Sequence, residues 1–183
     1  KSGDRFRYML GIRQKSNQYV LNSLKTTGEY EPSFTDVQAY ILFTPRKKFE
    51  ISILGNYARN RYKFIPQDRE TRFGSFSEAL QFKVYFDGQE IDQFESLFGA
   101  IDFTYKTKDS FQLSFVTSAY RSTESETVDI IGQYWLDELN LQSFYDEESD
   151  NEVAFNKGVG TFFNHARNYL YTDVVNFQFR GKY

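Results

Sequence analysis

The sequence predicts an all-β chain, and more specifically an antiparallel segment of a transmembrane β-barrel wall. Three observations predict this class. Apolar and polar residues alternate over six segments of about the ~10 residues that a tilted strand needs to cross a bilayer. The connections between these segments are alternately long and short. Aromatic side chains are frequent, with 20 Phe and 14 Tyr in 183 residues.

The composition favours a barrel wall over an ordinary soluble domain. A soluble core is built mainly of Leu, Ile and Val, whereas a barrel wall places Phe and Tyr on its lipid face and at its interfacial girdles. Length does not decide, because 183 residues would also suit one soluble domain. Charged residues interrupt every apolar run, so no segment reaches the ~20 apolar residues of a membrane-spanning helix. Any crossing is therefore expected to use strands.

Charge and termini limit the partners and the context. The formal net charge is -3 and the 22 Lys and Arg residues are dispersed, so nucleic acid is not an expected partner. The chain has no initiator Met, secretory leader or lipidation signal at its start, so we expect it to be a stretch of a longer polypeptide. It has no Cys, which fits an exported protein.

The first three expected strands each have one apolar and one polar face, because successive side chains of a strand point to opposite sides. Their apolar sets are Phe6, Tyr8, Leu10 and Ile12, then Val37, Ala39, Ile41 and Phe43, then Phe49, Ile51, Ile53 and Tyr57. Their polar sets are Arg5, Arg7 and Arg13, then Asp36, Gln38 and Tyr40, then Glu50, Ser52 and Asn56. Leu54 is an exception on the polar side.

The last three expected strands follow the same pattern. Their apolar sets are Leu97, Ile101, Phe103 and Tyr105, then Phe111, Leu113, Phe115 and Ala119, then Val175, Phe177 and Phe179. Their polar sets are Asp102 and Thr104, then Gln112, Ser114, Ser118 and Tyr120, then Asn176, Gln178 and Arg180. Phe98 is an exception on the polar side. We expect the charged residues of the polar sets to pair with one another and with a plug across the lumen of the barrel.

The connections predict the direction of the strands, because bacterial barrels have short periplasmic turns and long extracellular loops. The short connections, TPRKK at 44–48 and KTKDS at 106–110, are rich in turn-forming residues and are expected in the periplasm. The long connections are expected to be extracellular loops at about 14–34, 60–93 and 122–169.

Residues 80–94 contain one more alternating segment, followed by the turn dipeptide Asp87-Gly88. A seventh crossing there would place the longest connection in the periplasm. We therefore expect residues 80–94 to form a hairpin above the membrane, which leaves six crossings. Six strands cannot close a barrel, since known barrels have eight or more, so the remaining strands are expected elsewhere.

Six stretches of the chain carry a resemblance to a known family. They are RQKSNQYVLNSL at 13–24, GEYEPSFTDVQ at 28–38, FIPQDRETRFG at 64–74, YFDGQEID at 85–92, ESETVDIIGQYW at 124–135 and GVGTFFNHARNYL at 158–170. These stretches resemble the barrel region of TonB-dependent receptors that carry a carboxypeptidase-like regulatory domain at the N-terminus. The resemblance extends over essentially the whole chain, residues 1–183.

The resemblance implies a location and a set of partners. It implies a roughly 22-stranded barrel in the bacterial outer membrane whose lumen is filled by a plug domain. This chain would supply part of the barrel wall. The implied partners are outer-membrane lipid, the plug and remaining strands, the TonB complex through parts outside this chain, and a surface lipoprotein.

No enzyme is predicted. The only His is His165, and without Cys or a second His it cannot complete a metal site of the usual type. The expected role of His165 is hydrogen bonding in a loop near the last strand, together with Arg167. No cofactor is expected.

The third long loop holds the candidate contact residues. Tyr134, Trp135, Phe144 and Tyr145 flank an acidic run and are candidates for contact with a ligand or a partner, together with His165 and Arg167. The alternative is that these aromatic residues pack the loop. The acidic run offers carboxylates for calcium at Asp146, Glu147, Glu148 and Asp150, although its spacing matches no known calcium loop, and a solvated loop tip is the alternative.

Three functions remain open from the sequence. The first is import of a nutrient ligand, such as a siderophore, glycan or peptide, by a TonB-dependent transporter. The second is a barrel scaffold whose loops dock partner proteins in a surface complex. The third is a soluble secreted β-sandwich that acts as a binding module, since alternating strands with turn signals also describe that fold.

Overall fold

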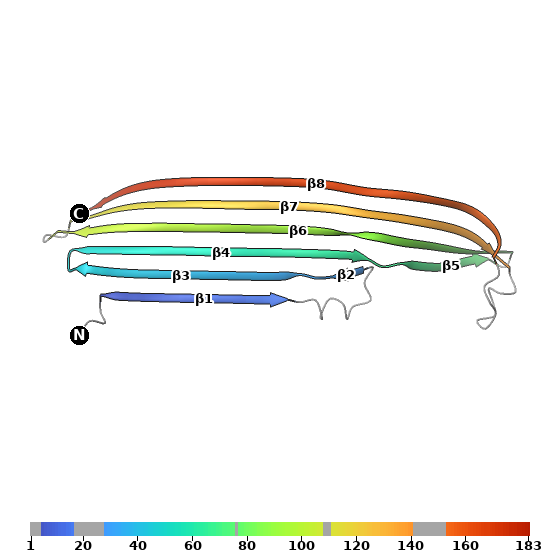
Figure 1. The fold of residues 1–183 in the computed structure, drawn as a ribbon, viewed down its shortest axis with the longest axis horizontal. Coiled ribbons are helices and arrows are strands. Elements are labelled where there is room, and N and C mark those ends of the chain that lie inside the picture. Colours follow the sequence, from blue (N-terminus) through green and yellow to red (C-terminus); the bar gives the residue numbers. More distant parts are fainter. Residues whose placement is uncertain (1–4, 17–27, 76, 108–110, 141–152) are drawn as a thin grey trace.

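The computed structural model describes residues 5–16, 28–75, 77–107, 111–140 and 153–183. It contains eight strands, β1 (Phe6–Ser16), β2 (Gly28–Tyr30), β3 (Ser33–Arg46), β4 (Phe49–Pro66), β5 (Arg69–Ser75), β6 (Glu78–Lys106), β7 (Gln112–Leu139) and β8 (Val153–Lys182). Six long strands lie side by side in the order β1-β3-β4-β6-β7-β8, which is their order along the chain (Figure 1). All pairs are antiparallel. The prediction of an all-β antiparallel chain with six neighbouring long strands is confirmed.

The sheet is a single open layer. The short strands β2 and β5 extend it by pairing with β4 and β6, and no described residue pairs with the outer edge of β1 or β8. The accessible surface of the chain is 13479 Å². A compact folded monomer of this mass would expose about 9200 Å². Both faces of the sheet are therefore largely uncovered in this chain. Among the described residues, no helix has the length and hydropathy to cross a membrane.

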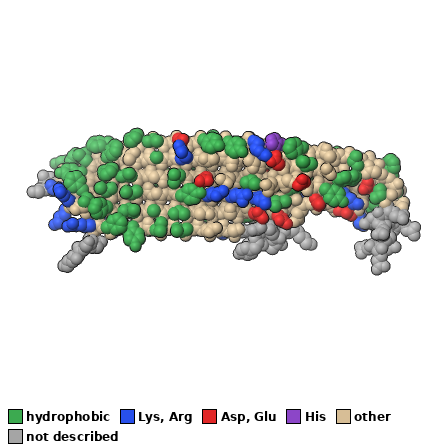
Figure 2. Space-filling model, viewed as in Figure 1, with side chains coloured by type: hydrophobic (Ala, Val, Ile, Leu, Met, Phe, Trp, Pro, Cys, Tyr) green, Lys and Arg blue, Asp and Glu red, His purple; other side chains and the backbone are tan. Residues whose placement is uncertain are grey.

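The cross-strand register places the apolar sets of all six long strands on one face, which we call the apolar face; the opposite side is the polar face. One row of this face contains Phe6, Phe43, Ile51, Phe103, Phe115 and Phe179, and the next contains Tyr8, Ile41, Ile53, Ile101, Thr117 and Phe177. Figure 2 shows hydrophobic side chains gathered over the end of the sheet that carries the β3–β4 turn, which we call the turn end. The predicted assignment of faces is thus confirmed.

The connections at the turn end are short, as the sequence predicts. Only residues 47 and 48 separate β3 from β4, so the predicted turn at 44–48 is shorter than expected. β6 and β7 are joined after Lys106, and the N–H of Thr107 donates to the carbonyl of Phe111 at 2.9 Å. Residues 108–110 of the predicted turn at 106–110 lie outside the described part.

The described residues of the predicted loops at 14–34, 60–93 and 122–169 are mostly in strands. In the predicted loop at 60–93, β4 continues to Pro66, β5 follows, and β6 begins at Glu78. In the predicted loop at 122–169, β7 continues to Leu139 and β8 begins at Val153. In the first predicted loop, at 14–34, the described residues form the end of β1, β2 and the start of β3, and residues 17–27 lie outside the described part. In these segments each strand stays paired with a neighbour, which satisfies its backbone N–H and C=O groups as well as the pairing near the turn end does, and this keeps the strands extended.

The prediction of a hairpin at 80–94 with its turn at Asp87-Gly88 is wrong. Both residues lie inside β6, opposite Ile131 and Ile130 of β7. The hairpin of this region is β5–β6, which turns between Ser75 and Glu78. Gly88 has a φ of 104°, so the glycine serves a local change in strand geometry rather than a reversal of the chain.

Candidate functional site

The polar face carries a group of carboxylates on β6 and β7, far from the turn end. Glu90 and Asp92 lie two residues apart on β6, so they share a face, and Glu126 of β7 lies directly opposite Asp92. One carboxylate oxygen from each lies within 4.8 Å of the others. We call these three residues the acidic cluster. The amide Nδ2 of Asn168 on β8 donates to Oε2 of Glu126 at 2.9 Å.

Electrostatics in the acidic cluster are unfavourable to full ionisation. Partial burial, followed by repulsion from Asp92 and Glu126, raises the pKa of Glu90. Burial and the charge of Glu126 raise the pKa of Asp92. The Oδ1 atom of Asp92 is buried and has no hydrogen-bond partner among the described residues. The cluster therefore has unused capacity to accept hydrogen bonds or to hold positive charge.

Aromatic rings flank the acidic cluster on β2 and β4. Tyr62 lies opposite Asp92, and Phe64 lies opposite Glu90. The ring of Tyr30 is 4.9 Å from that of Phe64 and 6.0 Å from that of Tyr62, centroid to centroid. Burial, then Tyr30 and the two carboxylates of β6, raises the pKa of Tyr62, which keeps its hydroxyl protonated. Rings beside carboxylates suit a hydroxyl-rich or cationic ligand, since rings stack and attract cations while carboxylates accept hydrogen bonds.

The three carboxylates could supply some, but not all, of the oxygen ligands of a divalent cation. Calcium takes six to eight oxygen ligands, and the acidic cluster offers one oxygen from each of three residues. The remaining ligands would have to come from elsewhere. No other group of three or more possible metal ligands is present among the described residues.

The two described aromatic candidates from the sequence do not act together, because they lie on opposite faces. Tyr134 is on the polar face, where its ring covers Gly160 of β8, and it lies 6.1 Å from the ring of Phe82. Trp135 is on the apolar face and meets Tyr85 edge to face at 5.2 Å. Phe144 and Tyr145 lie outside the described residues, as do the calcium candidates Asp146, Glu147, Glu148 and Asp150.

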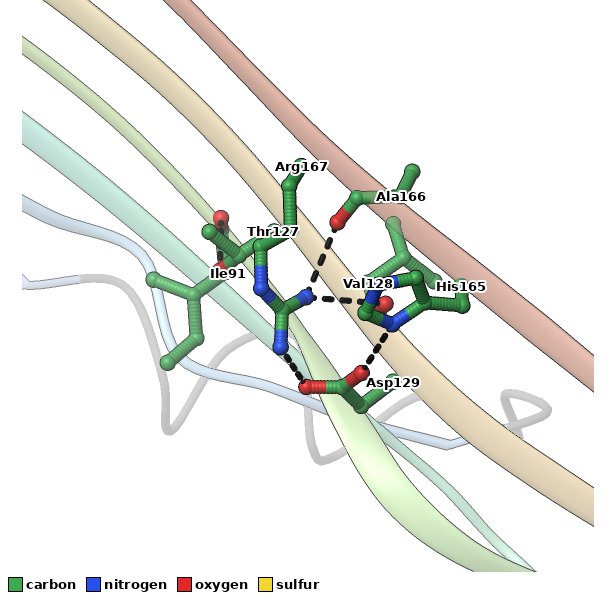
Figure 3. Close-up of polar contacts among 7 residues, drawn as sticks. All are labelled: Ile91, Thr127, Val128, Asp129, His165, Ala166 and Arg167. Atoms are coloured by element: carbon green, nitrogen blue, oxygen red, sulfur yellow. Dashed lines mark hydrogen bonds and ion pairs between the residues drawn. The ribbon is translucent and has the colours of Figure 1, made fainter.

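His165 and Arg167 meet a residue that the sequence did not single out. His165 lies opposite Asp129 of β7, and its Nδ1 is 2.6 Å from Oδ1 of Asp129, while Arg167 Nη2 donates to Oδ2 of the same carboxylate (Figure 3). These two bonds, the one from Arg167 first, lower the pKa of Asp129. His165 is therefore a hydrogen-bonding residue as predicted, but it sits inside the long strand β8 and not in a loop.

Arg167 also ties the two strands together. Its Nη1 donates to the carbonyls of Val128 at 3.1 Å and of Ala166 at 2.9 Å (Figure 3). The guanidinium thus bridges β7 and β8 on the apolar face.

The acidic cluster was missed by sequence reasoning for a specific reason. In the sequence, Glu90 and Asp92 are two positions apart, and so are Glu124 and Glu126. In a strand this spacing places both carboxylates of each pair on the same face. Both segments fell inside predicted loops, so no register joined them. Extending β6 and β7 as paired strands would have brought the carboxylates together.

Three comparisons with known proteins found no match to this chain. No family model matches the chain. No curated protein matches it. No solved structure matches it.

Proposed function

We propose that this chain is part of the barrel wall of a TonB-dependent transporter in the bacterial outer membrane. The observation that carries the proposal is an apolar band that crosses all six long strands in the rows of Ile51, Ile53 and Gly55, where Thr117 is the one polar member. In the next row, that of Tyr57, the band ends on β7 and β8 at the ion pair of Arg121 with Asp173. In β4 the band includes Phe49, Ile51, Ile53, Gly55 and Tyr57. These eight residue steps span about 27 Å along the strand, or roughly 21 Å across the membrane at a tilt of about 40°, close to the ~25 Å height of a barrel's apolar band.

Aromatic residues border the band on both sides, as lipid interfaces favour. At the turn end, Phe49 and Tyr105 pair across the strands with ring centroids 4.9 Å apart. At the other border lie Tyr57, Tyr169 and Tyr171, of which Tyr171 is 70% exposed. Beyond this border, the rows of the same face become polar. A band of this kind is costly to expose to water and stable against lipid.

The band also argues against the soluble sandwich. A sandwich buries the apolar side of one sheet against another sheet about 10 Å away. Here Phe177 and Phe179 are 68% and 70% exposed, and the buried apolar residues of the described chain lie in β6 and β7 at the end away from the band (Ala79, Val84, Val128, Ile130 and Leu139). Lipid supplies the cover that a second sheet would supply in a sandwich.

The uncovered edges of β1 and β8 support a larger barrel. Unpaired N–H and C=O groups are not tolerated in hydrocarbon, so further strands must continue the wall on both sides. The proposed parent has about 22 strands and a plug in its lumen, as the resemblance implies. The polar face then faces the lumen, where Arg13 pairs with Asp36 at 3.2 Å and Lys106 pairs with Glu50 at 3.1 Å.

In this proposal the chain contributes binding and passage, and it performs no catalysis. The acidic cluster and the rings of Tyr62 and Phe64 would line the outer part of the lumen, where an incoming nutrient is first held. Movement of the plug, driven by the TonB complex, would release the ligand inward. These moving parts and their energy coupling belong to other regions of the parent protein.

Uptake measurements test the transporter proposal. In cells that lack the parent protein, uptake of one nutrient class should fall to the level of passive leakage, and loss of TonB should give the same defect. Restoring the parent protein should restore uptake only when TonB is present. Normal uptake of every siderophore, glycan and peptide tested in the deletion strain would contradict import.

A scaffold is the second candidate, and one observation favours it. Beyond the band, the apolar face still exposes large side chains, with Phe163 at 62%, Val159 at 64% and Tyr85 at 47%. Such residues suit a docked partner protein, such as a surface lipoprotein. Charged substitutions at Val159 and Phe163 should then release a surface partner while leaving nutrient uptake intact, whereas loss of uptake without loss of a partner would favour the transporter alone.

A further inference from the structure

Three cations lie in a line where the apolar band ends. Arg59, Arg61 and Lys63 occupy alternate positions of β4, so they share the apolar face with Ile53 and Tyr57. Arg59 is only two residues beyond Tyr57, the last band residue of β4. We call these three residues the cationic strip. Figure 2 shows a row of Lys and Arg side chains in the middle of the sheet, directly beyond the hydrophobic region.

The two arginines of the strip have little compensating charge. Arg59 donates to the neutral Oε1 atom of Gln93 at 3.0 Å. Of the ion pairs formed by the described residues, none includes Arg59 or Arg61. Lys63 has a long contact of 3.6 Å with Glu31. The other arginines of this face differ, because Arg121 pairs with Asp173 and Arg167 pairs with Asp129.

Two negative charges lie beside the three positive charges of the strip, Glu31 at Lys63 and Glu95 opposite Arg59. On β3, Thr35 lies opposite Arg59 and Ser33 lies opposite Arg61, and both are neutral. On β6, the residues opposite Arg59, Arg61 and Lys63 are Glu95, Gln93 and Ile91. The strip therefore keeps a net positive charge. Its position fixes what can approach it, since the molecules next to a lipid-facing band are lipids.

The band beside the strip also has room for an acyl chain. A methyl group added at Gly55 or Gly99 would meet no atom within 4 Å. Gly99 lies in the lining of a hollow of about 360 Å³, together with Ile53, Ile101 and Ala119 of the apolar face. A lipid tail can fill such a hollow while its headgroup stays at the border of the band.

We propose that the cationic strip binds the phosphate headgroups of anionic lipids in the leaflet that borders this end of the band. The inference rests on the proposed membrane location. Guanidinium groups form bidentate hydrogen bonds to phosphate, and Arg59 and Arg61 are spaced to hold one or two headgroups. The bound headgroups would tie this end of the band to the level of the lipid phosphates.

The experiment uses the full-length parent protein, reconstituted in phosphatidylcholine bilayers with a fluorophore on Thr123→Cys. Thr123 lies in the same row as Arg59, two strands away. Phosphatidylglycerol carrying a nitroxide near its carbonyl groups is added as quencher, and nitroxide-labelled phosphatidylcholine is the reference lipid. Labelled phosphatidylglycerol should quench at about a tenfold lower mole fraction than the reference.

Matched variants identify the groups responsible. The double variant Arg59→Gln/Arg61→Gln should lose the preference for phosphatidylglycerol, and Arg59→Lys/Arg61→Lys should retain part of it. Arg180→Gln, on the polar face, should leave the preference unchanged. An equal preference in the glutamine variant and the unaltered protein would overturn the inference, and so would displacement of the lipid by inorganic phosphate.

The outcomes separate this inference from the proposed function. If neither labelled lipid quenched the fluorophore, the face would not lie against a bilayer, and the barrel proposal would fail together with the inference. If both lipids quenched equally in the unaltered protein, the face would lie against lipid, and only the proposed headgroup site would be rejected.

Discussion

Ile53 and Ser52 are adjacent on β4 and meet opposite surroundings. Ile53 lies between Ile41 and Ile101 in the apolar band, while Ser52 lies between Leu42 and Asp102 on the polar face. A charge at position 53 would have no partner in lipid. A cation at position 52 can pair with Asp102. Because the two positions differ by one residue, comparing them isolates the effect of the face.

We predict that Ile53→Arg destabilises the parent barrel by about 2–4 kcal/mol, the cost of a lipid-facing Arg near the midplane. Ser52→Arg should cost much less, since its side chain can be hydrated or paired. The measurement is the free energy of unfolding in urea from lipid vesicles, with surface abundance as a second readout. Equal damage by the two variants would mean that the apolar face packs against protein and not against lipid.

The acidic cluster predicts a pH dependence with a definite sign. The ordinary pKa values of Glu90 and Asp92 are 4.5 and 3.8, and both are raised in the folded chain. Below the ordinary values both carboxyls are neutral in either state and carry no penalty. As the pH rises through the raised values, the folded state ionises them at a cost that the unfolded state does not have, so stability falls.

We therefore predict that Glu90→Gln/Asp92→Asn flattens the decline in stability from about pH 4 upward. The double variant should be more stable than the unaltered parent protein at neutral pH and similar to it at low pH. Urea midpoints measured across this range provide the test. Glu124→Gln, which alters an exposed carboxylate outside the cluster, is the control, and a decline of unchanged slope in the double variant would reject the electrostatic account.

At the scale of elements, Gly88 is the position on which the extension of β6 depends. Its φ of 104° lies in a region that L side chains rarely adopt, and an added Cβ would lie 1.8 Å from the carbonyl oxygen of Asp129. Glycine is therefore required both by the backbone and by the close approach of β7. The dipeptide Asp87-Gly88 resembles a turn in the sequence because a glycine with positive φ serves turns and strand irregularities alike.

We predict that Gly88→Ala costs about 1–3 kcal/mol through backbone strain and the close contact. The loss should be local, with faster amide hydrogen exchange in the β7 segment opposite Gly88 and little change in the band. Gly99→Ala in the same strand is the matched control, because its added methyl group meets open space and the effect should stay within about 0.5 kcal/mol. Equal effects at the two positions would contradict the requirement for glycine at 88.

At the scale of the whole molecule, the two ends of the sheet should lie on opposite sides of the membrane. Lys47 is in the β3–β4 turn, and Ser77 is in the β5–β6 turn at the far end. The proposed orientation places Lys47 in the periplasm and Ser77 outside the cell. β4 runs from the turn that contains Lys47 to the end of the sheet that carries Ser77. If β4 crosses the membrane, the two turns must lie on opposite sides.

Cysteine labelling in intact cells tests this orientation. Since the chain has no native Cys, single substitutions Lys47→Cys and Ser77→Cys in the parent protein give clean readouts from this region. An impermeant thiol reagent should label position 77 in intact cells and position 47 only after the outer membrane is opened. Labelling of 47 with protection of 77 would invert the orientation, and labelling of both in intact cells would contradict a membrane crossing.

The faces and order of the long strands were predictable from the sequence alone. Phe115 and Ser114 fall on opposite sides because a strand has a period of two residues, and this period is a local property of the chain. The short connection between Arg46 and Phe49 makes β3 and β4 antiparallel neighbours for the same local reason. Even the exceptions, Leu54 and Phe98, are found on the polar face by simple counting.

The long extensions of the strands, the acidic cluster and the contacts of Asp129 with His165 and Arg167 were decided by tertiary structure. Asp129 and His165 are 36 residues apart, and they meet only because β7 and β8 stay paired far beyond the band. Glu126 reaches Asp92 through the same kind of long-range register. The alternation of apolar and polar residues predicts the face on which a side chain lies. It does not predict which residue of the neighbouring strand lies opposite, because that register depends on where pairing begins and how far it continues. That choice is made by cross-strand contacts, which no local pattern in the sequence contains.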